Sequence, residues 1–152
     1  MRRRLAGRIR VPLPPAEAFR LFTPRGEREW APGWDPKFPS PQADDGEPGV
    51  IFRTNADDHR TTWVVTERRE PIRIGYALVS PERAGTVTVT VGGSGANSAV
   101  HVVYDLTALD LASDHELEAF VAGYARYLQS WEHQIVAAVS RREPQRGAPP
   151  PG

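Results

Sequence analysis

The stretch SDHELEAFVAGYARYLQSWEHQIVAAVSRR, residues 113–142, decides the fold because it has the pattern of one long amphipathic helix. The apolar residues that recur at intervals of three and four are Leu117, Phe120, Val121, Tyr124, Leu128, Trp131, Ile135 and Val139. Ser113 and Glu116 match the S-x-x-E capping box of a helix N-terminus. We predict a helix from there to about Arg142, roughly 40 Å long at about 1.5 Å per residue. Gly123 interrupts it at a cost of about 1 kcal/mol, either for a close approach or for a mild bend.

Upstream of this helix the chain has the alternation that is typical of short strands. In residues 4–11, Leu5, Ile9 and Val11 fall on one face and arginines on the other, which predicts a half-buried strand. Further runs rich in Val, Ile, Thr and aromatic residues are separated by turn residues. The strands predicted from these runs cover residues 50–55, 60–68, 72–80, 86–91 and 98–109. Their short connections predict an antiparallel meander.

Two short helices are predicted between the first and second strands. The segment PAEAFRLF forms the first, with Pro15 at a first-turn position. Pro24 can begin the second, which should end at about Trp30 because Pro32 restricts the residue before it. Residues 35–49 are rich in Pro, Gly and Asp, so we predict a loop that crosses to the second strand.

These elements predict an α+β fold with one domain. A sheet must bury one face, and only the C-terminal helix is long enough to cover it. We therefore expect a curved antiparallel sheet of about six strands wrapped around that helix. The space left between them is a cavity with its mouth near the two short helices. The domain spans residues 1–142, and residues 143–152 form a disordered tail rich in Pro and Gly.

The order of elements and several local patterns resemble the START/Bet v 1-like (SRPBCC) helix-grip superfamily, most nearly its bacterial polyketide cyclase/dehydrase-like and Aha1-like members. The patterns are VPLPPAEAFRLFTP, GVIFRT, EPIRIGY, VVYDLTALD and YLQSWEHQI, within about residues 4–142. The resemblance implies a helix-grip fold with a hydrophobic ligand cavity. Because these families share no single reaction, it does not imply one activity.

Alternation along the strands predicts which side chains face the cavity, once Arg53, Arg68 and Arg73 are placed in solvent. The inward set is Val50, Phe52, Thr54, Trp63, Val65, Ile74, Tyr76, Leu78, Val87, Val89, Val91, Val100, Val102, Tyr104 and Leu106. The candidate ligand-binding residues are Trp30, Trp34, Phe52, Trp63, Tyr76, Tyr104, Phe120 and Tyr124. They either fill the core or line a pocket suited to flat, apolar ligands.

The segment GEREWAPGWDPKF, residues 26–38, carries two of these tryptophans over the open end of the predicted grip. Trp30 should end the second short helix, and Trp34 returns after a turn. The pair either gates the cavity or fastens the loop to the core. Glu27 and Glu29 beside them either orient a polar ligand group or are solvated helix charges.

No catalytic or metal-binding motif stands out. The four histidines have no metal-ligand spacing between them, and they are His59, His101, His115 and His133. His101, Asp105 and Tyr104 are the weak catalytic candidates. His101 should face outward, and only an inverted register would bring it into the cavity beside Asp105 as an acid or base. The sequence GGSGAN joins two strands, so it predicts a hairpin loop and not a phosphate-binding loop.

Composition excludes several classes of function. The chain has 19 basic and 19 acidic residues, so bulk charge does not favour nucleic acid or an anionic membrane as a partner. It has no cysteine, which excludes disulfides and thiolate chemistry. No apolar run approaches the ~18 residues of a membrane span, and no signal-peptide pattern opens the chain. We expect a cytoplasmic protein, monomer or homodimer, with a small hydrophobic molecule as its partner and no cofactor.

Three functions remain open at this point. The first is binding of a small hydrophobic or aromatic molecule, polyketide- or lipid-like, in the internal cavity. The second is a cyclase, aromatase or dehydratase that acts on a polyketide-like substrate there, which a polar cluster deep in the pocket would favour. The third is Aha1-like co-activation of a chaperone, which an exposed apolar patch would favour.

Overall fold

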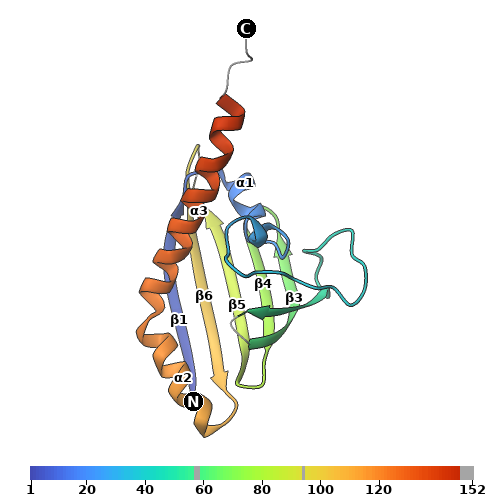
Figure 1. The fold of residues 1–152 in the computed structure, drawn as a ribbon, viewed down its shortest axis with the longest axis vertical. Helices are drawn as coiled ribbons and strands as arrows, with labels where there is room; N and C mark the ends of the chain where they lie inside the picture. Colours follow the sequence, from blue (N-terminus) through green and yellow to red (C-terminus); the bar gives the residue numbers. More distant parts are fainter. Residues whose placement is uncertain (57–58, 94, 148–152) are drawn as a thin grey trace.

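The computed structural model describes residues 1–56, 59–93 and 95–147. Its antiparallel sheet has six strands in the order β1-β6-β5-β4-β3-β2. The strands are β1 (Arg2–Val11), β2 (Ile51–Ala56), β3 (His59–Arg69), β4 (Arg73–Val79), β5 (Arg83–Gly92) and β6 (Ser98–Ala108). The helices are α1 (Pro15–Arg20), the 3-10 helix η1 (Gly26–Glu29), α2 (Leu111–Ala122) and α3 (Tyr124–Gly147). Figure 1 shows α2 and α3 running along the β1 and β6 side of the curved sheet, which confirms the predicted α+β class.

The strand register confirms nearly all of the predicted alternation. Every strand side chain expected to face inward is buried, except for the half-buried Trp63. Neighbouring strands place such residues directly opposite each other, as in the pairs Tyr76–Val87 and Val87–Tyr104. Because opposite residues share a face, these rows form one continuous apolar surface on the concave side.

Arg68 is on the opposite side of the sheet from the one predicted. The register of β3 against β4 shifts between Val65 and Glu67, and beyond the shift Arg68 lies opposite the buried Ile74. One extra residue in a strand reverses the alternation that follows it. Arg68 therefore shares the concave face with Ile74, and its guanidinium donates to Asp44 at 2.6 Å.

The C-terminal helix is divided into α2 and α3 at Gly123, where one continuous helix was predicted. The predicted cap is also wrong, because the side chain of Asp110, and not that of Ser113, caps α2 by accepting a hydrogen bond from the Ser113 N–H. The helical backbone of α3 continues past Arg142 to Gly147. The rest of the predicted tail, residues 148–152, lies outside the described residues.

The second predicted helix is a single 3-10 turn. The Trp30 N–H donates to the Glu27 carbonyl at 3.2 Å, a spacing of three residues. A Cβ at Gly26 would collide with the Arg20 carbonyl, so only glycine allows η1 to pack this closely against the end of α1. The η1 turn is thereby fixed at the end of the sheet near α1 (Figure 1).

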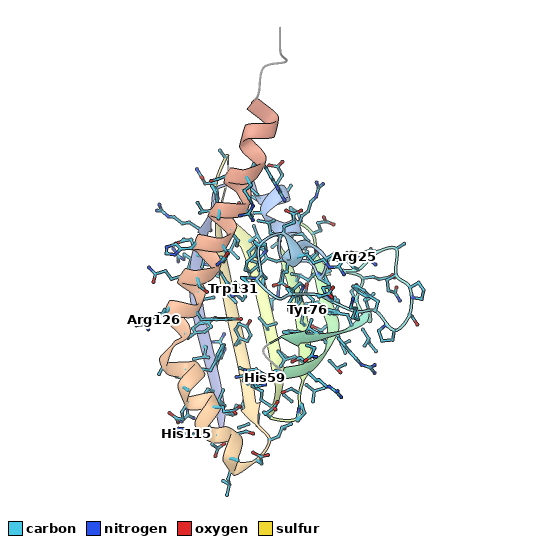
Figure 2. The ribbon with its side chains drawn as sticks, in the orientation of Figure 1. Arg25, His59, Tyr76, His115, Arg126 and Trp131 are labelled. Carbon is cyan, nitrogen blue, oxygen red and sulfur yellow. The ribbon has the colours of Figure 1, made fainter. Side chains whose placement is uncertain are left out.

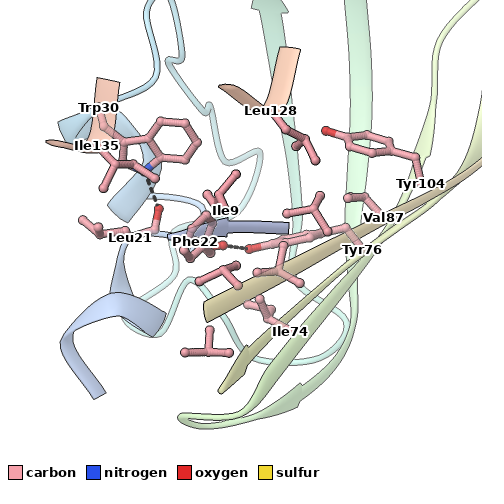
Figure 3. Packing of buried hydrophobic residues seen from close by; sticks show 14 of the residues in the cluster. Ile9, Leu21, Phe22, Trp30, Ile74, Tyr76, Val87, Tyr104, Leu128 and Ile135 are labelled. Atoms are coloured by element: carbon pink, nitrogen blue, oxygen red, sulfur yellow. Dashed lines mark hydrogen bonds between the residues drawn. The ribbon is translucent and has the colours of Figure 1, made fainter. Parts of the chain in front are cut away.

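The buried core joins these elements through hydrogen bonds as well as apolar contacts. The indole N–H of Trp30 donates to the Leu21 carbonyl at 2.7 Å. The hydroxyl of Tyr76 donates to the Phe22 carbonyl at 2.6 Å. Figure 3 shows both bonds among the packed side chains. The Tyr76 bond ties the segment between α1 and η1 to the sheet, and the Trp30 bond ties it to the end of η1.

Candidate ligand-binding cavity

A cavity of about 490 Å³ lies between the concave face of the sheet, α3 and the loop that joins η1 to β2. Elements far apart in the sequence form its walls. Its lining residues include Phe52 of β2, Tyr76 of β4 and Trp131 of α3. Tyr76 and Trp131 approach it from the sheet and from the helix respectively (Figure 2). The space that the curved sheet was expected to leave under the helix is therefore present.

One wall is a cluster of aromatic rings from β2, β3 and the joining loop. The rings of Phe52 and Trp63 are stacked with centroids 5.9 Å apart and an interplanar angle of 3°. Trp34 meets Trp63 edge-on at 5.5 Å, and Tyr76 meets it edge-on at 6.1 Å. The Trp63 indole N–H donates to the Thr54 hydroxyl at 2.9 Å, so its polar atom is satisfied. The wall presents ring faces and edges, which suit a flat ligand.

The opposite wall is a second aromatic cluster centred on Trp131. Its ring lies 5.2 Å from Trp30 and 5.4 Å from Tyr127. Tyr104 of β6 and Phe120 of α2 continue the cluster, with centroids 5.6 Å apart. The sheet and both C-terminal helices therefore enclose the cavity with aromatic groups.

The structure brings most of the predicted ligand-binding residues to this cavity. Those that line it are Trp30, Trp34, Phe52, Trp63, Tyr76, Tyr104 and Phe120. Tyr124 does not line it: its hydroxyl donates to the Val102 carbonyl at 2.8 Å, and the side chain is buried against β6. Tyr124 therefore fastens α3 to the sheet.

Two of the three weak catalytic candidates lie outside the cavity. His101 is exposed on the convex face, opposite Arg8 of β1. Asp105 is on the same face, and the Arg2 guanidinium binds it through hydrogen bonds of 2.9 and 2.8 Å and lowers its pKa. The inverted register that would have turned both inward is not the observed one. Only Tyr104 faces the cavity.

Glu27 lines the cavity and Glu29 does not, a difference that the sequence alone did not reveal. Glu29 pairs with Arg142 of α3, whereas Glu27 lines the cavity. Burial raises the pKa of the Glu27 carboxyl well above 4.5. Among the described residues, no hydrogen-bond donor or cation contacts this carboxyl. Spacing within a 3-10 turn gives no clear inward face, so the pattern of residues 26–30 offered no means to tell the two glutamates apart.

Three residues of α3 were also missed as cavity residues. Tyr127, Ser130 and Gln134 line it from the exposed side of the helix, and Tyr127 is 38% exposed. Pro32 is the exposed lining residue of the facing loop. The cavity therefore opens between α3 and this loop. The spacing of Tyr127 from Tyr124 and Trp131, three and four residues, was the available indication that it faces the same way.

The other ionisable groups that line the cavity are phenols and two basic side chains. Burial is the main cause that raises the pKa of Tyr76 and of Tyr104, so both remain neutral hydrogen-bonding groups. The Arg83 guanidinium lies 5.1 Å from the centre of the Phe120 ring, and His59 lies 3.7 Å from Glu82. Both basic groups thus have partners.

Within residues 1–56, 59–93 and 95–147, no group of three or more His, Asp or Glu side chains could hold a metal ion. None of the helices in the described part of the chain is long and apolar enough to cross a membrane.

The helix-grip class is defined by a curved antiparallel sheet that wraps around a long helix and leaves a cavity between the two, as found here with six strands. The chain belongs to the family described as polyketide cyclase/dehydrase and lipid transport, whose model matches residues 2–144. Among curated proteins, none matches the sequence.

Several solved structures share this fold. An uncharacterised protein from Rhizobium leguminosarum is 17% identical, with a TM-score of 0.67 over 90% of this chain and 96% of its own. CalU16 from Micromonospora echinospora is 15% identical, with a TM-score of 0.62 over 95% of this chain and 86% of its own. DynU16, a protein of the dynemicin biosynthetic locus, is 17% identical, with a TM-score of 0.59 over 86% of this chain and 46% of its own. At these identities the likeness shows the fold alone.

Proposed function

We propose that this protein binds a small hydrophobic or aromatic molecule, polyketide- or lipid-like, in the cavity between the sheet and α3. The observation that carries the proposal is the cavity itself, about 490 Å³ with aromatic walls on both sides. This volume lies within the roughly 300–1,000 Å³ typical of small-molecule sites, and such walls bind flat apolar groups.

The comparisons support this ligand class without naming a ligand. The family description combines polyketide chemistry with lipid transport, and both involve extended apolar molecules. DynU16, which shares the fold, is a protein of a biosynthetic locus. A product or intermediate of a biosynthetic sequence is therefore the kind of molecule we expect in the cavity.

Native mass spectrometry of the protein purified from its own host tests this proposal. We expect a second mass, from one retained small molecule, that disappears on denaturation. Val89→Phe adds bulk inside the cavity and should abolish this mass. Thr88→Phe adds the same bulk on the opposite face of β5 and should keep it. An adduct that survives Val89→Phe, or no adduct in any preparation, would contradict the proposal.

The second candidate function is cyclisation or dehydration of a polyketide-like substrate in the same cavity. Two polar groups that can move protons, the Tyr104 phenol and the Glu27 carboxyl, face this cavity and favour the enzyme. In such a reaction an enol carbon of the chain bonds to a ketone carbon while the enol loses its O–H proton and the ketone oxygen, whose C=O π bond breaks, takes up a proton. The resulting hydroxyl then leaves as water together with a proton from the former enol carbon, which forms a C=C bond. Incubation with a synthetic linear poly-β-ketone should then give a dehydrated product faster with wild-type protein than with Tyr104→Phe. Equal rates with and without protein would exclude this candidate for that substrate.

A further inference from the structure

We propose that Glu27 is the polar anchor of the cavity and selects aromatic ligands that carry a carbonyl oxygen. This inference rests on the proposed binding function. It names the group that orients the ligand and the chemical feature that the ligand must have.

The backbone holds Glu27 in a fixed position at the cavity wall. Its N–H donates to the Thr23 carbonyl at 3.1 Å, and its carbonyl accepts from the N–H groups of Trp30 and Ala31 at 3.2 and 2.8 Å. Trp30 is itself fixed by its indole hydrogen bond to Leu21. The side chain thus starts from a rigid turn, and it lines the cavity together with Trp30 and Trp131.

Among the side chains that the structure describes, none pairs with this carboxyl as a cation or donates a hydrogen bond to it. The titratable groups that face it are phenols: Tyr76 from β4, Tyr104 from β6 and Tyr127 from α3. The Tyr76 hydroxyl already donates to the Phe22 carbonyl, so it is not a donor to Glu27.

The cations around Glu27 have other partners. On its own turn Arg28 pairs with Asp35, and Glu29 is the carboxylate that pairs with Arg142. Of the basic groups that line the cavity, Arg83 lies over the Phe120 ring and His59 lies next to Glu82.

Glu27 is half-buried and lines an aromatic cavity. A carboxyl in such a site without a cation keeps its proton to higher pH than a fully solvated one, and burial is the cause that raises the pKa of Glu27. In that form it is a hydrogen-bond donor. The ligand atom that complements it is an acceptor, and a ketone oxygen on an aromatic body satisfies both the carboxyl and the walls. Ionisation removes the donor, so the preference for a carbonyl should fall as pH rises through the pKa of Glu27.

Two probes of nearly equal shape isolate this hydrogen bond, 2-acetylnaphthalene and 2-isopropylnaphthalene. Titration calorimetry at mildly acidic pH should show the ketone binding wild-type protein about five- to tenfold more tightly, the factor for one net hydrogen bond. The preference should decline toward alkaline pH. Equal affinities at acidic pH would overturn the proposal.

Three variants assign the effect to Glu27. Glu27→Leu should bind both probes equally. Glu27→Gln keeps an N–H donor, so it should keep the ketone preference but lose its pH dependence. Glu29→Gln, the matched change on the exposed side of the same turn, should behave as wild type. A ketone preference that persists in Glu27→Leu would overturn the proposal, and thermal unfolding of each variant verifies that it is folded.

The cationic probe 2-(aminomethyl)naphthalene tests the opposite protonation state. If it binds wild-type protein more tightly than the ketone at neutral pH, Glu27 acts as a carboxylate that attracts cations, and the proposal fails. If both neutral probes bind with equal affinity, the proposed role of Glu27 is refuted but the proposed binding function stands. If none of the three probes binds, the proposed binding function is refuted as well.

Discussion

Trp30 and Trp34 have different roles although they are only four residues apart. Trp30 is 4% exposed, donates a hydrogen bond to Leu21 and packs against Phe22 and Trp131. Trp34 is half-buried and lines the cavity, and its indole N–H donates to the Pro24 carbonyl at 2.7 Å. Both rings line the cavity. We interpret Trp30 as mainly a core residue that stabilises the fold, and Trp34 as mainly a cavity residue that controls access to the ligand space.

Alanine substitutions should separate these roles. Trp30→Ala should lower the free energy of unfolding by about 3–5 kcal/mol, as expected for a large buried aromatic residue. Trp34→Ala should cost at most about half as much, because the ring is only half-buried. It should also speed dissociation of bound 2-isopropylnaphthalene in stopped-flow measurements. Equal stability losses with an unchanged dissociation rate would refute this division.

Glu27 should leave a measurable pH dependence in the stability of the protein. Burial raises its pKa in the folded state above the ordinary value of 4.5, so the native state holds this proton more tightly than the unfolded state does. Its stabilising contribution is fully present below about pH 4.5 and is lost as pH rises through the folded-state pKa. Urea unfolding across pH should show the wild-type free energy of unfolding falling relative to that of Glu27→Gln. A difference that is constant with pH would show that the pKa of Glu27 is not raised.

At this scale the sequence predicted the strand residues well and the turn residues poorly. The period of two along a strand reports burial directly, so Phe52, Tyr76 and Tyr104 could be assigned to the concave face in advance. It failed at Arg68, because a bulge leaves no mark in the alternation before it. Glu27 was beyond prediction because its orientation depends on how η1 packs against α1 and not on a repeating pattern.

The packing of α3 against the sheet depends on a close contact at Gly7 of β1. A Cβ at this position would collide with the Cδ1 atom of Leu128, and Tyr124 lies next to the same point. The absence of a side chain at Gly7 lets the helix approach β1, which sets one side of the cavity.

Gly7→Ala should therefore force α3 away from β1 or shift Leu128 in the packed core. We expect a loss of about 1–3 kcal/mol in the free energy of unfolding, the range for overpacking. In a Leu128→Ala background, Gly7→Ala should cost less stability than it does in the wild-type protein, because Leu128→Ala removes the atom with which the new Cβ collides. Additive effects in urea unfolding would show that the two positions are not in contact.

An alanine substitution at Gly123, where the helix breaks between α2 and α3, should raise the stability of the protein, whereas the one at Gly7 should lower it. The Gly123 φ of −96° is open to any residue, and a Cβ there would meet only the Ala119 carbonyl oxygen at an ordinary 3.5 Å. Gly123→Ala should stabilise the protein by about 0.5–1 kcal/mol by reducing the freedom of the unfolded chain. A rise in the thermal midpoint would confirm this, and a fall would show that the break requires glycine.

The order and type of the elements were predictable because each has a strong local pattern. The alternating runs and the long amphipathic segment gave six strands and a C-terminal helix in the correct order. Helix ends were less predictable, because the choice between Asp110 and Ser113 as the cap depends on which backbone N–H each side chain reaches.

The whole molecule combines a continuous core with a space that the core does not fill. The concave face of the sheet and α3 do not meet everywhere, and aromatic rings from both sides border the gap instead of closing it. Lining residues on the exposed side of α3 and in the facing loop leave the gap open to solvent at one side. We expect a ligand of the proposed kind to enter through this opening without unfolding of the sheet.

The most direct test of a ligand cavity is the measurement of intermolecular nuclear Overhauser effects between 2-isopropylnaphthalene and the methyl groups of the protein. Val87 and Val89 are buried, line the cavity and carry methyl groups that only an internal ligand can reach. We expect strong effects from the naphthalene ring protons to both valines and none to Val103, on the outer face of β6. Effects confined to exposed side chains, or no binding at all, would contradict it.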